Sequence, residues 1–151
     1  MPKFEICAAS ENDIPLIMDF IRELAMYEKL EDQVVITPAL LRTHLFEKPQ
    51  ASCILGWEDQ QAVGFAFYFY NFSTFLGKPG LYLEDLFVSP EYRGKGYGKK
   101  MLLHLKQMAI EQGCGRMEWS VLDWNTPAID FYKSIGAEPM NEWTVFRLTL
   151  H

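Results

Sequence analysis

The sequence has few residues of the types that hold metals or form disulfides. Its three cysteines, Cys7, Cys53 and Cys114, are an odd number with no C-x-x-C pair, and its three histidines are scattered. This usage excludes a disulfide framework and disfavours a zinc site. We therefore expect reduced thiols, no metal cofactor and a cytoplasmic location.

Long hydrophobic runs are also missing. No stretch approaches the roughly eighteen apolar residues of a membrane-spanning helix, and the start, MPKFEICAAS, lacks the basic flank and apolar core of a secretory signal. We expect neither membrane insertion nor secretion.

Positive charge is in short supply. Lys and Arg number 14 against 20 Asp and Glu, which gives a net charge of −6. A general nucleic-acid binder needs a basic face, because phosphates dominate its affinity, so we expect no nucleic-acid partner. The acidity instead suits a small cationic molecule, although acidity alone is more often a matter of solubility.

The chain is long enough for one domain, residues 1–151, with its own core. Apolar alternation and periodicity predict an α/β (α+β) fold with a mixed sheet. We expect strands at residues 4–9, 52–57, 62–72, 81–88, 116–122 and 142–150, and helices after Ser10, from Pro38 to about Phe46, from about Gly98 to Gly113, and from Thr126 to about Ile135.

One loop is unusually rich in glycine and basic residues. In YRGKGYGKK, Gly94, Gly96 and Gly98 alternate with basic side chains between an expected strand and an expected helix. Glycines and a helix N-terminus let backbone N–H groups approach an anion, so the loop is a candidate pyrophosphate site. It matches neither GxxxxGK[ST] nor GxGxxG. A plain turn with solvated lysines is the alternative.

Two motifs resemble the GNAT superfamily of acetyl-CoA-dependent N-acetyltransferases. The segment LYLEDLFVSPEYRGKGYGKKMLLHL is similar to its central motif V-x-x-x-x-R-x-x-G-x-G, and DWNTPAIDFYKSIGA is similar to its N-x-x-A-x-x-F-Y-x-x-x-G motif. The matching residues are Val88, Arg93, Gly96 and Gly98 in the first motif and Asn125, Ala128, Phe131, Tyr132 and Gly136 in the second. Within the superfamily, LAMYEKLEDQV, LYLEDLFV and FYKSIGA look most like the spermidine/spermine (diamine) and thialysine N-acetyltransferases.

The resemblance implies a fold, a cofactor and site residues. It implies a GNAT fold, with a mostly antiparallel sheet of about seven strands flanked by about four helices, and a homodimer. Acetyl-CoA is the implied co-substrate, and the implied contacts to it are Leu86, Phe87, Val88, Arg93, Gly94, Lys95, Gly96, Tyr97, Gly98, Lys99, Asn125 and Ala128. The implied contacts to a small amine are Tyr27, Glu28, Glu84, Asp85 and Glu142.

The implied chemistry is transfer of an acetyl group to a primary amine. An alkylammonium of pKa about 10.4 is only about one part in a thousand neutral near pH 7.4, so a proton must be removed. We expect Glu84 to remove it through water, and Tyr132 to act as the general acid for the leaving thiolate. Backbone N–H groups where strand 81–88 splays from its neighbour would stabilise the oxyanion.

Alternatives stay open at each step. Tyr132 could be a core aromatic, and Glu84 could be a structural partner of Arg22 or Arg147. A polyamine is the main expected acceptor, and thialysine or a lysine-like amino acid is the alternative. A sensor that binds acyl-CoA without turnover is the alternative outside catalysis.

Overall fold

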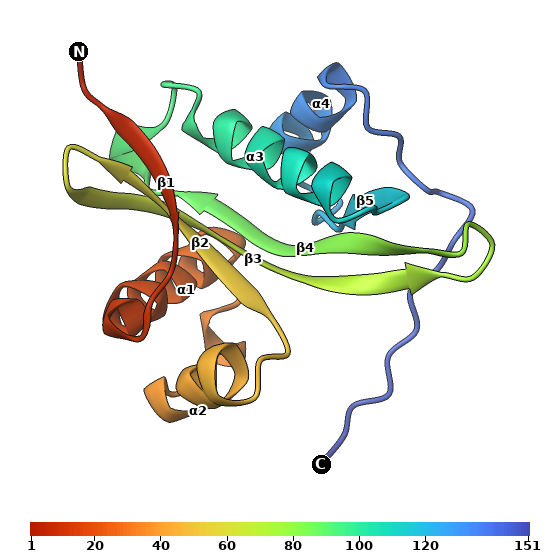
Figure 1. The fold of residues 1–151 in the computed structure, drawn as a ribbon, viewed down its shortest axis with the longest axis horizontal. Coiled ribbons are helices and arrows are strands. Elements are labelled where there is room, and N and C mark those ends of the chain that lie inside the picture. The colour runs from red at the N-terminus through yellow and green to blue at the C-terminus, as the bar shows by residue number, and fades with distance from the viewer. The chain divides into compact units, whose positions relative to one another are not determined.

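The computed structural model of the protein describes all residues from 1 to 151, and they form two compact units, Met1–Ser120 and Val121–His151. Figure 1 shows both along the chain, from red to blue. Each unit is described by itself below.

A five-stranded sheet with the order β1-β2-β3-β4-β5 forms the centre of the first unit. The first four strands pair antiparallel, and β5 pairs parallel to β4. The mixed sheet predicted from the sequence is therefore confirmed. The strands are β1 (Phe4–Ala8), β2 (Ser52–Glu58), β3 (Gln61–Ser73), β4 (Lys78–Val88) and β5 (Arg116–Trp119).

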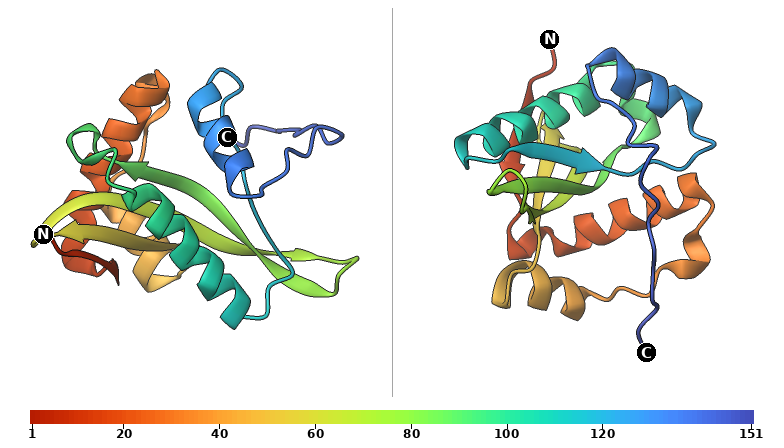
Figure 2. Two further views of the ribbon diagram at one scale, coloured as in Figure 1. Left: turned by 90° about the horizontal axis from the view of Figure 1, so that it is seen from above. Right: turned by 90° about the vertical axis from the view of Figure 1, so that its right-hand side faces the viewer.

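Helices cover both faces of this sheet. In the first unit, α1 (Ile14–Glu28) and α2 (Pro38–Arg42) lie on one face and α3 (Tyr97–Glu111) lies on the other, as Figures 1 and 2 show. The second unit contains α4 (Thr126–Ser134). The expectation of about four helices is confirmed.

Local signals in the sequence explain where helices begin. The Ser10 backbone N–H donates to the Asp13 carboxylate at 2.8 Å, as in a capping box, and a 3₁₀ turn, Glu11–Asp13, leads into α1. The Thr37 side chain accepts the Leu40 N–H at 3.2 Å at the start of α2, which has proline at its first position. Both starts agree with the sequence prediction.

The main core lies between α1, α2 and the sheet. Ile17, Leu41, Leu55 and Phe65 are almost completely buried there. The Phe65 ring stacks on the Phe20 ring of α1, with the ring centroids 5.6 Å apart. This packing fixes α1 against β3, so the C-terminal end of α1 and the middle of the sheet form one rigid frame.

The expected number of strands was wrong, because the sheet has five strands and not about seven. The segment 142–150 reads as a strand by composition, yet it forms none, and every side chain from 138 to 151 is exposed. A strand exists only where a neighbouring strand supplies hydrogen bonds, and this segment has no such partner in the structure. None of the helices has the length and apolar character needed to span a bilayer.

Candidate active site

The glycine loop precedes α3 and leaves backbone N–H groups available. Gly94 and Gly96 both have φ of 81°, the left-handed region that favours glycine, and a Cβ atom at either position would meet nothing within 4 Å. The first backbone hydrogen bond of α3 runs from the Lys100 N–H to the Gly96 carbonyl, at 3.0 Å. The preceding N–H groups at the helix N-terminus have no intrahelical partner, which suits a phosphate group. The loop therefore fits the pyrophosphate of acetyl-CoA.

The buried Tyr97 side chain fixes the end of the glycine loop to β1 and β2. The Tyr97 ring stacks on Phe4 at 4.0 Å between centroids, and its hydroxyl donates to the Glu58 carboxylate at 2.5 Å. The same carboxylate accepts the Lys95 ammonium at 2.8 Å. The hydrogen bond to Glu58 raises the pKa of Tyr97 to about 12, so this phenol stays protonated. The Tyr97 side chain therefore has a structural role. The predicted contact of this residue with the cofactor would be made by its backbone.

Arg93 connects the loop to the end of α1. Its Nε donates to the Val88 carbonyl at 2.9 Å, and its guanidinium lies 4.9 Å from the Tyr27 ring centroid and 5.1 Å from that of Phe87. Tyr27 is followed by Glu28, and both are predicted substrate contacts. Arg93 therefore supports the loop and also joins it to the side of the site predicted for the amine.

The sheet opens beside the predicted acetyl contacts. β5 pairs with β4 only from Gly80 to Leu83, so the following residues of β4 have no partner on that edge. Leu86, Phe87 and Val88 lie in this unpaired stretch and pair with β3 on the other side. This unpaired edge of β4 lies where the resemblance implies that backbone N–H groups stabilise an oxyanion, a role that stays a prediction.

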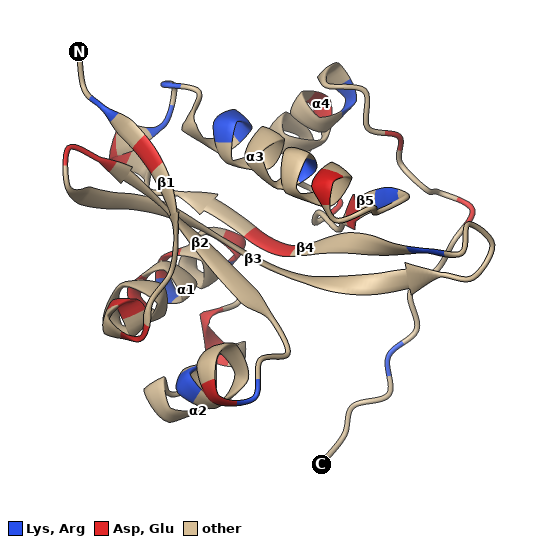
Figure 3. Cartoon of the chain, in the orientation of Figure 1, with Lys and Arg blue, Asp and Glu red and all other residues tan.

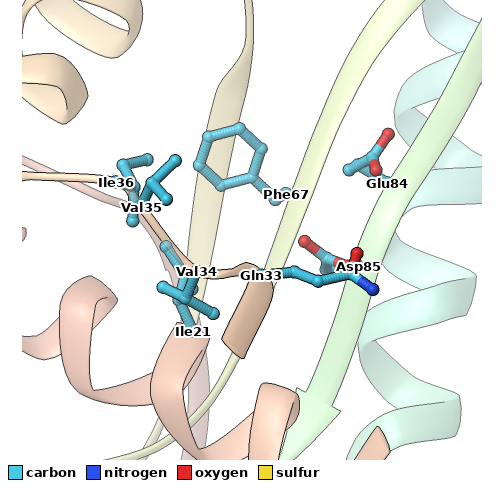
Figure 4. Close-up of a pocket in the computed structure, with 8 residues that line it drawn as sticks. All are labelled: Ile21, Gln33, Val34, Val35, Ile36, Phe67, Glu84 and Asp85. Atoms are coloured by element: carbon cyan, nitrogen blue, oxygen red, sulfur yellow. The ribbon is translucent and has the colours of Figure 1, made fainter. Parts of the chain in front are cut away.

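A cavity of about 300 Å³ lies between the middle of α1, the loop that follows this helix, and strands β3 and β4. Figure 4 shows the Asp85 side chain extending from β4 toward the wall that contains Ile21 and Val34. Apolar side chains form most of the lining, and the only carboxylates are those of Glu84 and Asp85. The lining residues are Ile21, Gln33, Val34, Val35, Ile36, Phe67, Glu84 and Asp85.

Sequence reasoning missed one wall of this cavity. Gln33, Val34, Val35 and Ile36 follow a short 3₁₀ turn, Glu31–Gln33, and were not singled out. The available signal was an apolar Val-Val-Ile run inside a polar connection. Phe65 and Phe67 of β3 are two residues apart and so lie on the same face of the sheet. Phe65 belongs to the core, and Phe67 packs against that core and also lines the cavity.

Two of the predicted substrate carboxylates, Glu28 and Glu84, act on a third, Asp85. Burial, followed by the charges of Glu84 and Glu28, raises the pKa of Asp85 to about 7. Burial also raises the pKa of Glu28. Figure 3 shows the acidic pair as a red band in the middle of β4. Arg22, considered above as a partner of Glu84, instead pairs with Asp19 at 3.4 Å.

The second unit holds the other motif. The Asn125 side chain accepts a hydrogen bond from the Ala128 N–H at 3.4 Å and so caps the start of α4. Gly136, with φ of 94°, follows the end of this helix. Tyr132 lies on α4 beside Phe131, with ring centroids 5.7 Å apart. Glu142 is exposed in the irregular segment after the helix. Three of the four predicted site residues of this unit thus share one helix and its cap.

Comparison with known proteins identifies the family. The acetyltransferase (GNAT) family pattern matches residues 18–137, which include both motifs. The chain belongs to the GNAT acetyltransferase family. GNAT acetyltransferases use acetyl-CoA, and the prediction that the chain is an N-acetyltransferase is confirmed.

Two curated relatives and one solved structure are similar to this chain over nearly all of its length. Thialysine N-epsilon-acetyltransferase of Bos taurus is 41% identical over 151 residues, covering 92% of this chain and 88% of the bovine protein. Spermidine/spermine N(1)-acetyltransferase-like protein 1 of Homo sapiens is 37% identical and covers 97% of this chain but 23% of the human protein. An integron cassette protein of V. cholerae has 30% identity and a TM-score of 0.80, covering 97% of this chain and 92% of that structure.

Replacing Arg93 by alanine is expected to weaken acetyl-CoA binding about tenfold and to lower the free energy of unfolding by about 1 kcal/mol. The variant loses the hydrogen bond to Val88 and the contacts with Tyr27 and Phe87. Calorimetric titration with CoA and urea denaturation measure the two effects. Arg93→Lys keeps the charge without the planar stack, and we expect it to be nearly as impaired. Wild-type behaviour of Arg93→Lys would show that charge alone matters.

Proposed function

We propose that this GNAT enzyme acetylates the side-chain amine of a lysine-like amino acid, with thialysine as the representative acceptor. The observation that carries the proposal is the composition of the cavity, which has apolar walls and carboxylates on the β4 side only. An ammonium group can lie at the carboxylates while an uncharged chain lies along Ile21, Val34 and Phe67.

The apolar walls distinguish between acceptors. A polyamine carries a second cation a few methylene groups from the reacting amine, and placing that cation against apolar side chains costs solvation that no neighbouring charge restores. The chain of thialysine has a neutral thioether at the corresponding place. The names of the bovine, porcine and murine relatives, all thialysine N-epsilon-acetyltransferases, support the same choice.

The residues divide the chemistry among them. The N–H groups of the glycine loop and the N-terminus of α3 would bind the pyrophosphate of acetyl-CoA, with Lys99 adding charge. The unpaired N–H groups of β4 would bind the carbonyl oxygen as it gains charge. Tyr132 would donate a proton to the departing thiolate, and the Asn125 and Ala128 end of α4 would contact the cofactor arm.

Turnover of a set of amines tests the proposal. Purified protein is mixed with acetyl-CoA and thialysine, lysine, ornithine, putrescine, spermidine or spermine, and CoA release and product mass are measured. We expect kcat/KM for thialysine to exceed that for putrescine by at least about tenfold. We expect Tyr132→Phe to lose about a hundredfold in kcat. A preference for spermidine over thialysine would contradict the proposed acceptor.

Polyamine acetylation is the second candidate, and the acidic cluster favours it. Glu28, Glu84 and Asp85 together carry more negative charge than one ammonium requires. The human relative is named for spermidine and spermine. If Glu28 contacts a second cation, Glu28→Gln would raise KM for spermidine and leave KM for thialysine nearly unchanged.

Three further expectations stay predictions: a homodimer, a cytoplasmic location and a single domain over residues 1–151. Sedimentation equilibrium with and without CoA measures the first. Limited proteolysis near residue 120 tests the last, since a single cooperative domain resists cleavage there.

A further inference from the structure

The two carboxylates of β4 lie at a β-bulge. In the pairing with β3, Phe67 lies opposite Asp85 and Tyr68 lies opposite Leu83, so Glu84 is the extra residue. A bulge re-aims side chains that would otherwise alternate between the faces of a sheet. This explains how two consecutive residues, Glu84 and Asp85, both line the same cavity.

The bulge places the two carboxylates in different surroundings. Glu84 is exposed to solvent, whereas Asp85 is partly buried in the cavity, where Figure 4 shows it near the Gln33 side chain. The charged groups that raise the pKa of Asp85 are Glu84 on its own strand and Glu28 on α1. Asp85 in turn acts on the buried Cys53 thiol of β2, whose pKa is raised to about 12, chiefly by burial, so this thiol is neutral.

We propose that Asp85, and not Glu84, is the catalytic residue that takes the proton from the ammonium group of the acceptor. This inference rests on the proposed acetylation of an amine. In it, Glu84 attracts the ammonium from solvent, and Asp85 receives the proton inside the cavity. Of the two carboxylates that line the cavity, Asp85 is the less exposed and Glu84 the more exposed to solvent.

The proton balance of the step is complete. The ammonium gives one proton to the Asp85 carboxylate, and the neutral amine attacks the thioester carbonyl, forming the C–N bond. The C–S bond then breaks, the thiolate takes a second proton from the acylated nitrogen by way of the general acid, and protonated Asp85 releases its proton to water. The products are the amide, CoA as the thiol and one proton.

The environment of Asp85 suits this role. A general base works best when its pKa is near the working pH. Burial and the neighbouring negative charges raise the pKa of Asp85 from 3.8 to about 7. Each pKa step is a factor of ten, so transfer from the ammonium is about a thousandfold less unfavourable than to an ordinary aspartate.

Matched variants at the two positions test the inference. Asp85→Asn and Glu84→Gln each remove one charge at nearly constant volume, and Asp85→Glu restores the acid. With a lysine-like acceptor we expect Asp85→Asn to lower kcat about a hundredfold or more, and Asp85→Glu to recover part of it. We expect Glu84→Gln to raise KM with a smaller change in kcat. An acceptor whose amine is made weakly basic by neighbouring fluorine atoms should recover much of the kcat of Asp85→Asn.

A second measurement does not depend on turnover. The protein is labelled with ¹³C-aspartate, and the Asp85 carboxyl signal is assigned by its loss in Asp85→Asn. We expect this signal to titrate near neutral pH. Its titration should shift to lower pH when lysine is bound in the absence of acetyl-CoA, where no reaction can occur. Titration as an ordinary aspartate, unaffected by the amine, would overturn the inference. So would a loss of kcat confined to Glu84→Gln.

The failure of the inference and that of the proposed function are distinguishable. If the wild-type protein acetylates no amine, the proposed function fails before any variant is compared, and the role of Asp85 fails with it. If the wild type is active and Asp85→Asn keeps its kcat and its pH profile, only the role of Asp85 is wrong.

Discussion

Gly64→Ala is expected to lower the free energy of unfolding by about 3 kcal/mol, because there is no room for a methyl group at this position. Gly64 on β3 lies opposite Val88 on β4. A Cβ atom there would lie 2.6 Å from the Phe87 carbonyl oxygen and 3.3 Å from the Val88 Cα, both backbone atoms. The two strands would have to separate where β4 leads into the glycine loop.

The same displacement should reach the cofactor site. Val88 accepts the Arg93 hydrogen bond, so a shift of this part of β4 moves the support of the loop. We expect Gly64→Ala to weaken CoA binding about tenfold, measured by calorimetry beside urea denaturation.

Gly98→Ala is the control for this prediction, with an effect of opposite sign. Its Cβ would meet only the Val88 Cγ2, at 3.8 Å, which is an ordinary contact, and alanine favours the helix by up to about 1 kcal/mol. Equal denaturation midpoints for Gly64→Ala and the wild type would show that the strands adjust without cost, contrary to the prediction.

Local sequence signals predicted much of the fold. The Ser10 and Asp13 capping box, the proline after Thr37 and the glycine after α4 mark helix ends that depend on neighbouring residues only. Strand pairing depends on distant residues, and there the prediction was weaker. The segment 142–150 has a strand-like composition but no strand beside it, so composition alone misassigned it.

The candidate site also has parts that the sequence predicts and parts that it does not. The loop from Arg93 to Gly98 could be found as a motif, because its glycine conformations are a local property. The difference between Glu84 and Asp85 could not be found, because it arises from a register shift between β3 and β4. The wall formed by residues 33–36 was missed for a similar reason, since the packing of a loop against the sheet decides which of its side chains line the cavity.

Asp85→Asn is expected to make the protein more stable above neutral pH while removing activity. The pKa of Asp85 in the folded protein is about 7, raised from 3.8, so the folded state holds a proton that the unfolded state has lost between these values. The stability that this group contributes is complete below about pH 4 and is lost as pH rises through about 7. At pH 8 the wild type holds a buried charge, and asparagine does not.

The expected gain for Asp85→Asn is about 3 kcal/mol larger at pH 8 than at pH 5, because the wild type loses about 1.4 kcal/mol for each pH step between pH 5 and its pKa of about 7. Urea denaturation at both pH values measures this difference. Glu84→Gln is the matched control and should gain less than about 1 kcal/mol at either pH, because its carboxylate is exposed. A gain for Asp85→Asn that is the same at pH 5 and pH 8 would contradict the prediction. A gain that grows from pH 5 to pH 8 would mean that the fold tolerates an unfavourable charge at Asp85, which is expected of a residue kept for chemistry and not for stability.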